Sequence, residues 1–485
     1  MAGAAAGAAA PAPPAQRRAS GGGYRRLLGP FDATMIVAGS MIGSGIFIVP
    51  AEIAHEVGTA GWLVAVWALA GAMTVVAARA FAELSIAYPR AGGQYVFLRE
   101  AFGPLAGFLY GWTLALVIQT GTIAAVAVAF ATYLAEIVPA LGDPVWVRMA
   151  GFSISARQLV AVAMIALLTA ANARGLHVGK RIQNSFTVVK LAALVAIVLI
   201  GLGPGWNSQA VAANLAAPFS TEFANGWIVT AFGAAMVGAL FSADAWSNVT
   251  FTAAEVREPH RTLPRALLVG TMIVVGLYLL VNLAYLSILP ARDGASMDGL
   301  GGSVAAAPGG RVATAAMGAA IGGDAAVVMA ILVMVSTFGC ANGLVLAGPR
   351  LIQAMAADGL FFRGLARLAN NGVPQRALVA QGLWASVLAL SGRYGQLLDY
   401  VIATALVFYA LTMFGLFRLR RRPEFVAATR GVRTGTLLPA VYVALALAIT
   451  VDLLIVKPSA TWPGFAIVAC GLPAAFLWRR GATQV

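Results

Sequence analysis

The first long apolar stretch of the chain contains, at residues 39–47, the sequence Gly-Ser-Met-Ile-Gly-Ser-Gly-Ile-Phe. A glycine destabilises a helix by about 1 kcal/mol relative to alanine, so three glycines within nine residues predict a local break. Unwinding at Gly43, Ser44 and Gly45 would expose backbone N–H groups at the start of the following half-helix, where an anion such as a carboxylate can bind. The alternative is that these glycines only allow helices to pack closely.

The sixth apolar stretch, about residues 225–256, is also interrupted in its middle, where it reads FSADAWSN over 241–248. It carries a carboxylate, Asp244, and an ionisable residue inside an apolar span is a functional-site hypothesis by default. Interruptions in the first and sixth apolar stretches are what an inverted five-plus-five repeat with broken helices produces. We therefore expect a first five-helix repeat over 30–203 and a second, inverted repeat over 225–420.

The composition indicates that the chain spans a membrane. Of 485 residues, 60% are hydrophobic and 10% are charged, whereas a soluble domain carries about 25% charged residues. Two cysteines exclude a disulfide-stapled scaffold. The sequence predicts an all-α polytopic membrane protein with about 12 transmembrane helices. The expected segments are about 30–56, 62–87, 104–138, 158–173, 182–203, 225–256, 265–289, 324–356, 376–391, 396–418, 435–456 and 461–478.

Lysine and arginine predict the orientation of these segments. With the N-terminus inside, 24 of the 32 basic residues lie in cytoplasmic segments and six lie outside, as the positive-inside rule expects. Both termini are then cytoplasmic. Because the basic residues follow the loops, the net charge of +14 does not indicate a nucleic-acid partner. Residues 1–29 begin with low-complexity Ala, Pro and Gly and are expected to form a disordered tail.

Lys190 is a further charge within a span. The fifth segment begins near Ile182, which places Lys190 about 12 Å deep at 1.5 Å per residue. At that depth the ammonium could serve a site inside the protein, or it could reach back to the cytoplasmic interface.

Several separated motifs resemble the amino acid–polyamine–organocation superfamily, and most closely its L-type amino acid transporter branch. They are GSMIGSGIF at 39–47, YPRAGGQYVFLREAFG at 88–103, FATYL at 130–134, IQNSFTVVK at 182–190, FSADAW at 241–246, EVREPHRTLPRA at 255–266, STFGCANG at 336–343 and PRLIQAMAADG at 349–359. The resemblance implies a LeuT-like fold, with 435–480 as two peripheral helices, in a carrier of the cell membrane.

The resemblance also implies a substrate site between the first and sixth spans. The substrate carboxylate would meet backbone N–H groups around Gly43, Ser44 and Gly45. Its ammonium would meet carbonyl groups near Ile42, Phe241 and Ser242, with Phe241 as an aromatic gate. Lys190 matches the lysine that replaces a sodium ion in the family, which implies sodium-independent transport. Two polar residues near mid-span, Gln119 and Asn342, either line the pocket or form interhelical hydrogen bonds.

The chain departs from the family in two places. Residues 139–157 contain no cysteine, so no disulfide-linked ancillary subunit is expected. Asp244 stands where the family usually has glycine. Three roles are open for it: it caps freed N–H groups, it carries a coupled proton, or it pairs with the positive charge of the substrate.

The favoured function is a secondary-active amino acid transporter that works by alternating access, as an exchanger or a proton-coupled symporter. Carriage of another small amine or a polyamine is an alternative. A membrane-embedded enzyme is not supported, because the three histidines, at 55, 177 and 260, form no metal-ligand pattern. A channel is not supported either, because it would need rings of charged residues or a filter sequence, and the sequence shows neither. The sequence predicts no metal site and no cofactor.

Overall fold

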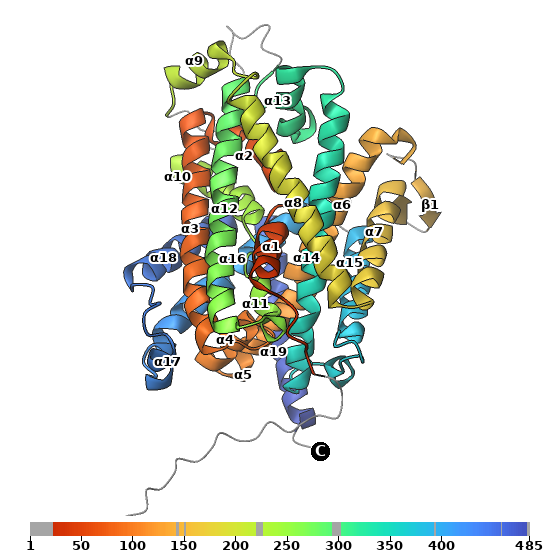
Figure 1. The fold of residues 1–485 in the computed structure, drawn as a ribbon, viewed down its shortest axis with the longest axis vertical. Coiled ribbons are helices and arrows are strands. Elements are labelled where there is room, and N and C mark those ends of the chain that lie inside the picture. Colours follow the sequence, from red (N-terminus) through yellow and green to blue (C-terminus); the bar gives the residue numbers. More distant parts are fainter. Residues whose placement is uncertain are drawn as a thin grey trace, which may run out of the picture.

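The computed structural model describes residues 23–141, 145–149, 152–219, 227–292, 302–391, 394–456 and 458–482. In Figure 1 long helices run side by side along the vertical axis, and short helices cover both ends of the bundle. In chain order the first half contains α1 (Pro30–Met41), α2 (Gly45–Val57), α3 (Ala60–Ala87), α4 (Gln94–Phe102), α5 (Pro104–Thr113), the π-helix η1 (Leu114–Ile118), α6 (Gln119–Ile137), the 3-10 helix η2 (Pro139–Leu141), β1 (Val145–Met149), β2 (Phe152–Ser155), α7 (Ala156–Ala173), α8 (Leu176–Gly201) and α9 (Ser208–Ala216).

The second half begins with a broken helix, as the first half does. It contains α10 (Ile228–Ser242), α11 (Asn248–Phe251), the 3-10 helix η3 (Ala253–Glu255), α12 (Pro259–Ile288), η4 (Pro308–Gly310), α13 (Val312–Ile321), α14 (Ala325–Ala357), η5 (Arg363–Ala366), α15 (Gln375–Ser391), α16 (Tyr394–Leu419), α17 (Pro423–Ala428), α18 (Leu437–Val456) and α19 (Pro458–Ala482).

Each of the twelve expected segments contains helix in the described part of the chain, which confirms an all-α polytopic membrane protein. Eight helices there are long and apolar enough to cross a membrane by themselves, and the pair α1 and α2, bent by 40°, adds a ninth span. The sixth segment is not among these spans because its helix α10 ends at the break, after 15 residues, and is too short to cross a membrane by itself. α15 has only 17 residues, and the apolar part of α19 is Thr461–Phe476. The inverted repeat stays a prediction.

Several elements were not anticipated by the sequence. The connection 88–103 contains the helix α4, which follows the positive-φ glycines Gly92 and Gly93. β1 and β2 form an antiparallel hairpin, a small departure from an all-helical chain. The connection at 291–323 contains α13, and residues 293–301 of it lie outside the described part. Short amphipathic or glycine-bounded pieces of this kind carry too weak a periodicity to be recognised from sequence alone.

The end of the expected N-terminal tail is held against the bundle, which corrects the expectation of disorder for residues 23–29. The amides of Leu27 and Leu28 both donate to the backbone oxygen of Glu255 at 2.9 Å. Leu28 is fully buried, and the Tyr24 hydroxyl donates to Gln353 Oε1 at 3.0 Å. Burial of Leu28 together with these hydrogen bonds offsets the entropy cost of ordering the segment. Residues 1–22 lie outside the described part of the chain.

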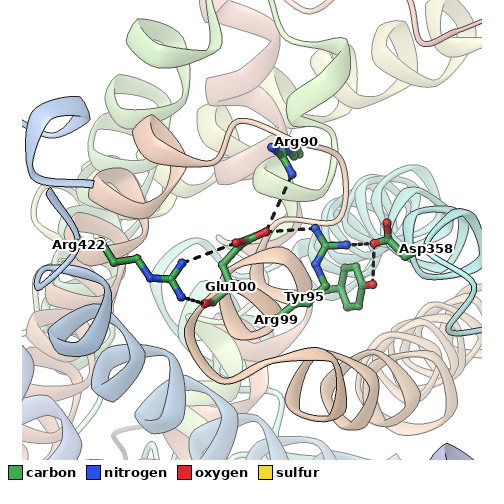
Figure 2. A network of polar contacts seen from close by, with 6 residues as sticks. All are labelled: Arg90, Tyr95, Arg99, Glu100, Asp358 and Arg422. Carbon is green, nitrogen blue, oxygen red and sulfur yellow. Dashed lines mark hydrogen bonds and ion pairs between the residues drawn. The ribbon is translucent and has the colours of Figure 1, made fainter. Parts of the chain in front are cut away.

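Near the lower end of the bundle in Figure 1, a network of polar side chains ties α4 to its neighbours, as Figure 2 shows from close by. Tyr95 and Arg99 both contact the Asp358 carboxylate, and the Tyr95 hydroxyl donates to it at 2.7 Å. On the opposite side, Arg422 lies 3.8 Å from the Glu100 carboxylate and donates to the Glu100 carbonyl at 2.8 Å. Burial and the Asp358 carboxylate raise the pKa of the Tyr95 phenol, so Tyr95 stays protonated and acts as the donor.

Candidate functional site

The first span breaks where the sequence places its Gly-Ser-Gly. α1 ends at Met41, Ile42 has an extended backbone (φ −78°, ψ 97°), and α2 begins at Gly45 after Ser44. The last carbonyl groups of a helix and the first N–H groups of the next have no partner within their own helix. The break therefore places a partly negative helix end beside a partly positive one.

Lys190 lies inside this break and does not reach the cytoplasmic interface. Its side chain comes from α8 and is 1% exposed. The ammonium donates to Gly39 O and Ile42 O, both at 2.7 Å, and to Ser336 O of α14 at 3.1 Å. A positive charge on two carbonyl oxygens at the C-terminal end of α1, those of Gly39 and Ile42, complements the helix dipole. It also joins the first, fifth and eighth spans.

Three further side chains donate to carbonyl groups of the first break, and none of the three was predicted as a site residue. Ser336 Oγ donates to Gly43 O at 2.8 Å, and Cys340 Sγ to Ser40 O at 3.0 Å. The Tyr278 hydroxyl of α12 lies 3.2 Å from Met41 O and 3.1 Å from Ser242 O. It thereby links the two broken helices. Ser336 and Cys340 are spaced i, i+4 on one face of α14, and this spacing could have indicated from sequence that both face the same site. No pattern in the sequence indicated a site role for Tyr278.

Two of the three glycines in the first span are required by close packing. A Cβ atom on Gly39 would lie 2.1 Å from Thr187 Oγ1, and one on Gly45 would lie 2.1 Å from Ser242 Oγ and 3.0 Å from the Ser242 Cα. Gly45 therefore brings α2 against the end of α10. A Cβ on Gly43 would meet Cys340 Sγ at 3.3 Å, a contact that a small shift relieves. Gly43 is thus the glycine for which packing explains least.

The second break separates α10 from α11. Phe241 and Ser242 form the buried end of α10, and the Ser242 hydroxyl donates back to Gly238 O at 2.8 Å. Ala245 has a positive φ of 64°, which is rare for a residue with a side chain and marks a strained turn. Such a backbone conformation persists only where the surrounding residues hold it in place.

Asp244 lies at this turn, half-buried. Its Oδ1 accepts the Tyr409 hydroxyl of α16 at 2.7 Å, and its carboxylate also accepts the Ala245 amide. The N-cap of α11 is Ser247, so Asp244 binds a freed N–H group in the turn and does not cap the second half-helix. The N-cap role is thus corrected to a hydrogen bond within the turn, whereas proton carriage and pairing with the substrate stay predictions.

A small polar cavity adjoins Asp244. It holds about 20 Å³ and is lined by residues of six α-helices, of the π-helix η1 and of the second break, among them Gln119, Tyr110, Asp244, Asn248 and Tyr409. That volume accommodates about one water molecule and no amino acid. The Asn248 amide nitrogen in this wall is buried without a hydrogen-bond partner among the described residues. The cavity beside the second break is therefore too small for an amino acid in this conformation.

The two polar residues near mid-span have different surroundings. Gln119 lines the cavity and donates to Leu344 O at 2.9 Å. Asn342 is fully buried between α7, α8 and α14, where it donates to Gly179 O at 3.0 Å and Gln183 Oε1 at 2.9 Å and accepts from Asn172 at 2.9 Å. Asn342 is thus an interhelical hydrogen-bonding residue, and the suggestion that it lines the pocket is corrected. Within the described ranges, no group of three His, Cys, Asp or Glu side chains is placed to hold a metal ion.

Comparison with known proteins decides the family. The sequence profile described as "Amino acid permease" matches residues 28–476. The chain belongs to the amino acid permease family. It is 27% identical, over 90% of its own length and 83% of the relative, to the human (Homo sapiens) b(0,+)-type amino acid transporter 1. It is 28% identical, over 94% of its own length and 83% of the relative, to the human Asc-type amino acid transporter 1. It is also 28% identical, over 93% of its own length and 80% of the relative, to the large neutral amino acids transporter small subunit 2 of Oryctolagus cuniculus. This permease is accordingly an amino acid transporter and not an enzyme, in agreement with the resemblance seen in its motifs.

Proposed function

We propose that this permease is a sodium-independent carrier that binds an amino acid zwitterion at the breaks of its first and sixth spans. It works by alternating access, as an exchanger or with proton coupling, in the cell membrane with both termini cytoplasmic. The observation that carries the proposal is the position of Lys190. Its ammonium contacts carbonyl groups of the first and eighth spans at 2.7–3.1 Å, where it supplies a fixed positive charge.

The polarity of the first break supports zwitterion binding. The N-terminal end of α2 presents N–H groups that suit a carboxylate. The ammonium group of the substrate needs acceptors, and Ile42 O already accepts Lys190 and Ser336. Ser242 O likewise lies at hydrogen-bond distance from Tyr278. Substrate binding therefore requires these carbonyl groups to rearrange, or requires another acceptor such as Asp244.

The small volume of the cavity supports alternating access. A site that holds about 20 Å³ must open toward one side before an amino acid enters. Helix breaks supported by side-chain hydrogen bonds are suited to such opening, because half-helices can move as units around them. The relatives' names point to amino acids as the substrate class.

Uptake by proteoliposomes tests the proposal. Purified protein is reconstituted with a mixture of unlabelled amino acids inside, and entry of labelled amino acids is measured with sodium, potassium or choline as the only external cation. We expect saturable uptake that is stimulated by internal amino acid and is the same in all three media. Uptake that depends on sodium, or that does not saturate, would contradict the proposal.

A covalently bound ancillary subunit is not part of the proposed transporter. Of the two cysteines, Cys340 is buried beside the first break and Cys470 lies in α19. Neither lies between the third and fourth spans. Migration as a single species on non-reducing gels of whole membranes is the expected result.

A further inference from the structure

A groove on the outside of the bundle lies apart from the helix breaks. It runs between α3, α10 and α18 and encloses about 360 Å³. Its lining is apolar with one exception, the carboxylate of Asp452. Cavities of this size, with apolar walls and few polar groups, are the usual form of a ligand-binding site.

The carboxylate of Asp452 has no cation to balance it among the described residues. Its Oδ2 is buried and has no hydrogen-bond partner there. It lies over the backbone of α10, since a Cβ atom on Gly233 would be 2.0 Å from Oδ2. Gly233 therefore provides the space that the carboxylate occupies. An unpaired charge at this depth is costly, so a cationic group from outside the chain would complement it.

The groove lies near one membrane surface. Trp62 is close to the start of α3, Val229 is close to the start of α10, and Asp452 comes four residues before the end of α18. At 1.5 Å per residue, Asp452 is about 6 Å from that helix end. The positive-inside orientation places these three ends outside. The carboxylate is therefore at the depth where phospholipid headgroups meet the acyl chains.

We propose that this groove binds a phospholipid with a primary-ammonium headgroup, whose ammonium pairs with Asp452 while an acyl chain lies along α10. Charge complementarity selects the headgroup, because an anionic lipid would be repelled by the carboxylate. Phe232 and Trp62, whose rings lie 6.0 Å apart edge to face, add aromatic surface that favours a nearby cation. Val229 is 65% exposed on the rim, so the groove is open to the bilayer.

The proposed lipid would contact the half-helix that ends at the second break. α10 runs from the groove to Phe241 and Ser242, so a bound lipid would brace the helix that must move during transport. This site is separate from the substrate site and does not depend on the proposed transport mechanism.

Competitive lipid retention tests the proposal. The full-length protein is purified in mild detergent and mixed with equal amounts of phosphatidylethanolamine, phosphatidylcholine and phosphatidylglycerol that carry the same acyl chains. Bound lipids are then counted by native mass spectrometry. We expect phosphatidylethanolamine to be retained in preference to the other two. Loss of this preference is expected in Asp452→Asn, and in Gly233→Ala, which displaces the carboxylate without removing its charge.

Asp324→Asn is the matched control, because Asp324 is an exposed carboxylate at the same predicted side of the membrane. It should keep the full lipid preference. Equal retention of the three lipids by the unmodified protein, or an unchanged preference in Asp452→Asn, would overturn the proposal. A photoreactive residue at Val229 gives an independent readout. A lipid adduct is expected there, whereas an adduct to a second copy or to another protein would show that the groove has a different occupant.

Discussion

Arg350 and Glu255 form a two-point ion pair in the interior of the bundle. Arg350 Nε donates to Glu255 Oε2 at 2.9 Å, and its terminal nitrogen donates to Oε1 at 3.0 Å. Both side chains are 2% exposed. The backbone oxygen of Glu255 also accepts the amides of Leu27 and Leu28. One residue thus connects the N-terminal segment, the end of the sixth span and the eighth span at the predicted cytoplasmic end.

Breaking this pair should destabilise the protein strongly. Glu255→Gln leaves a buried guanidinium without its counter-charge, and losses of this kind are about 3–5 kcal/mol. The double variant Glu255→Met with Arg350→Met removes both charges and should cost clearly less. Thermal unfolding in detergent measures both. A single variant that is no less stable than the double variant would show that the pair is not the source of stability.

Accessibility to an impermeant thiol reagent tests the orientation. With Cys470 changed to serine, Gly322→Cys should be labelled from outside in intact cells and Arg421→Cys only after permeabilisation. Both positions are exposed, and they lie on opposite sides in the positive-inside topology. The reverse pattern would invalidate the orientation and, with it, the side of the membrane assigned to Asp452.

Lys190→Ala should impair transport without preventing insertion. A hydrogen bond from a charged donor contributes about 1.5–3 kcal/mol. If even one of the Lys190 hydrogen bonds is needed for transport, its loss should lower the rate of uptake by about tenfold or more. Uptake into proteoliposomes measures it. Arg181→Ala is the control, since Arg181 is an exposed cation on the same helix and its variant should transport normally. Normal uptake by Lys190→Ala would refute a functional role for this ammonium.

Gly43 and Gly45 should respond differently to alanine. At Gly45 the added Cβ would overlap Ser242 Oγ at 2.1 Å, whereas at Gly43 it would meet Cys340 Sγ at 3.3 Å. Gly45→Ala is therefore expected to lower thermal stability. Gly43→Ala should retain near-normal stability but bind substrate more weakly, because a carboxylate needs close approach to the backbone. Unchanged substrate affinity in Gly43→Ala would mean that this glycine does not face the substrate.

Asp244→Asn separates the roles of the carboxylate. Asparagine can still accept the Tyr409 hydroxyl and the Ala245 amide, which hydrogen-bond to Asp244 in the native protein. We expect the variant to fold and to exchange amino acids at equal pH but to lose stimulation of uptake by a pH gradient. An unchanged pH response would indicate a purely structural role, and weaker binding at every pH would indicate direct pairing with the substrate.

The sequence by itself determined the features that depend on local composition. Long apolar segments specify a helical membrane protein because each span must satisfy its own backbone hydrogen bonds. The Gly-Ser-Gly at 43–45 determines where the first span breaks, since glycine weakens a helix wherever it stands. The distribution of lysine and arginine predicted the orientation, and the motifs indicated the family that the sequence profile then identified.

Only the tertiary structure decided which groups meet at the breaks. The carbonyl groups at the first break accept hydrogen bonds from Lys190, Tyr278, Ser336 and Cys340, which are about 150 to 300 positions away in the chain. No local pattern encodes such pairings, because they arise when several helices pack at fixed distances. The same reason explains why Asn342 proved to be an interhelical residue. It also explains why the end of the predicted tail is ordered, since residues 23–29 gain hydrogen bonds from distant residues such as Lys180, Glu255 and Gln353.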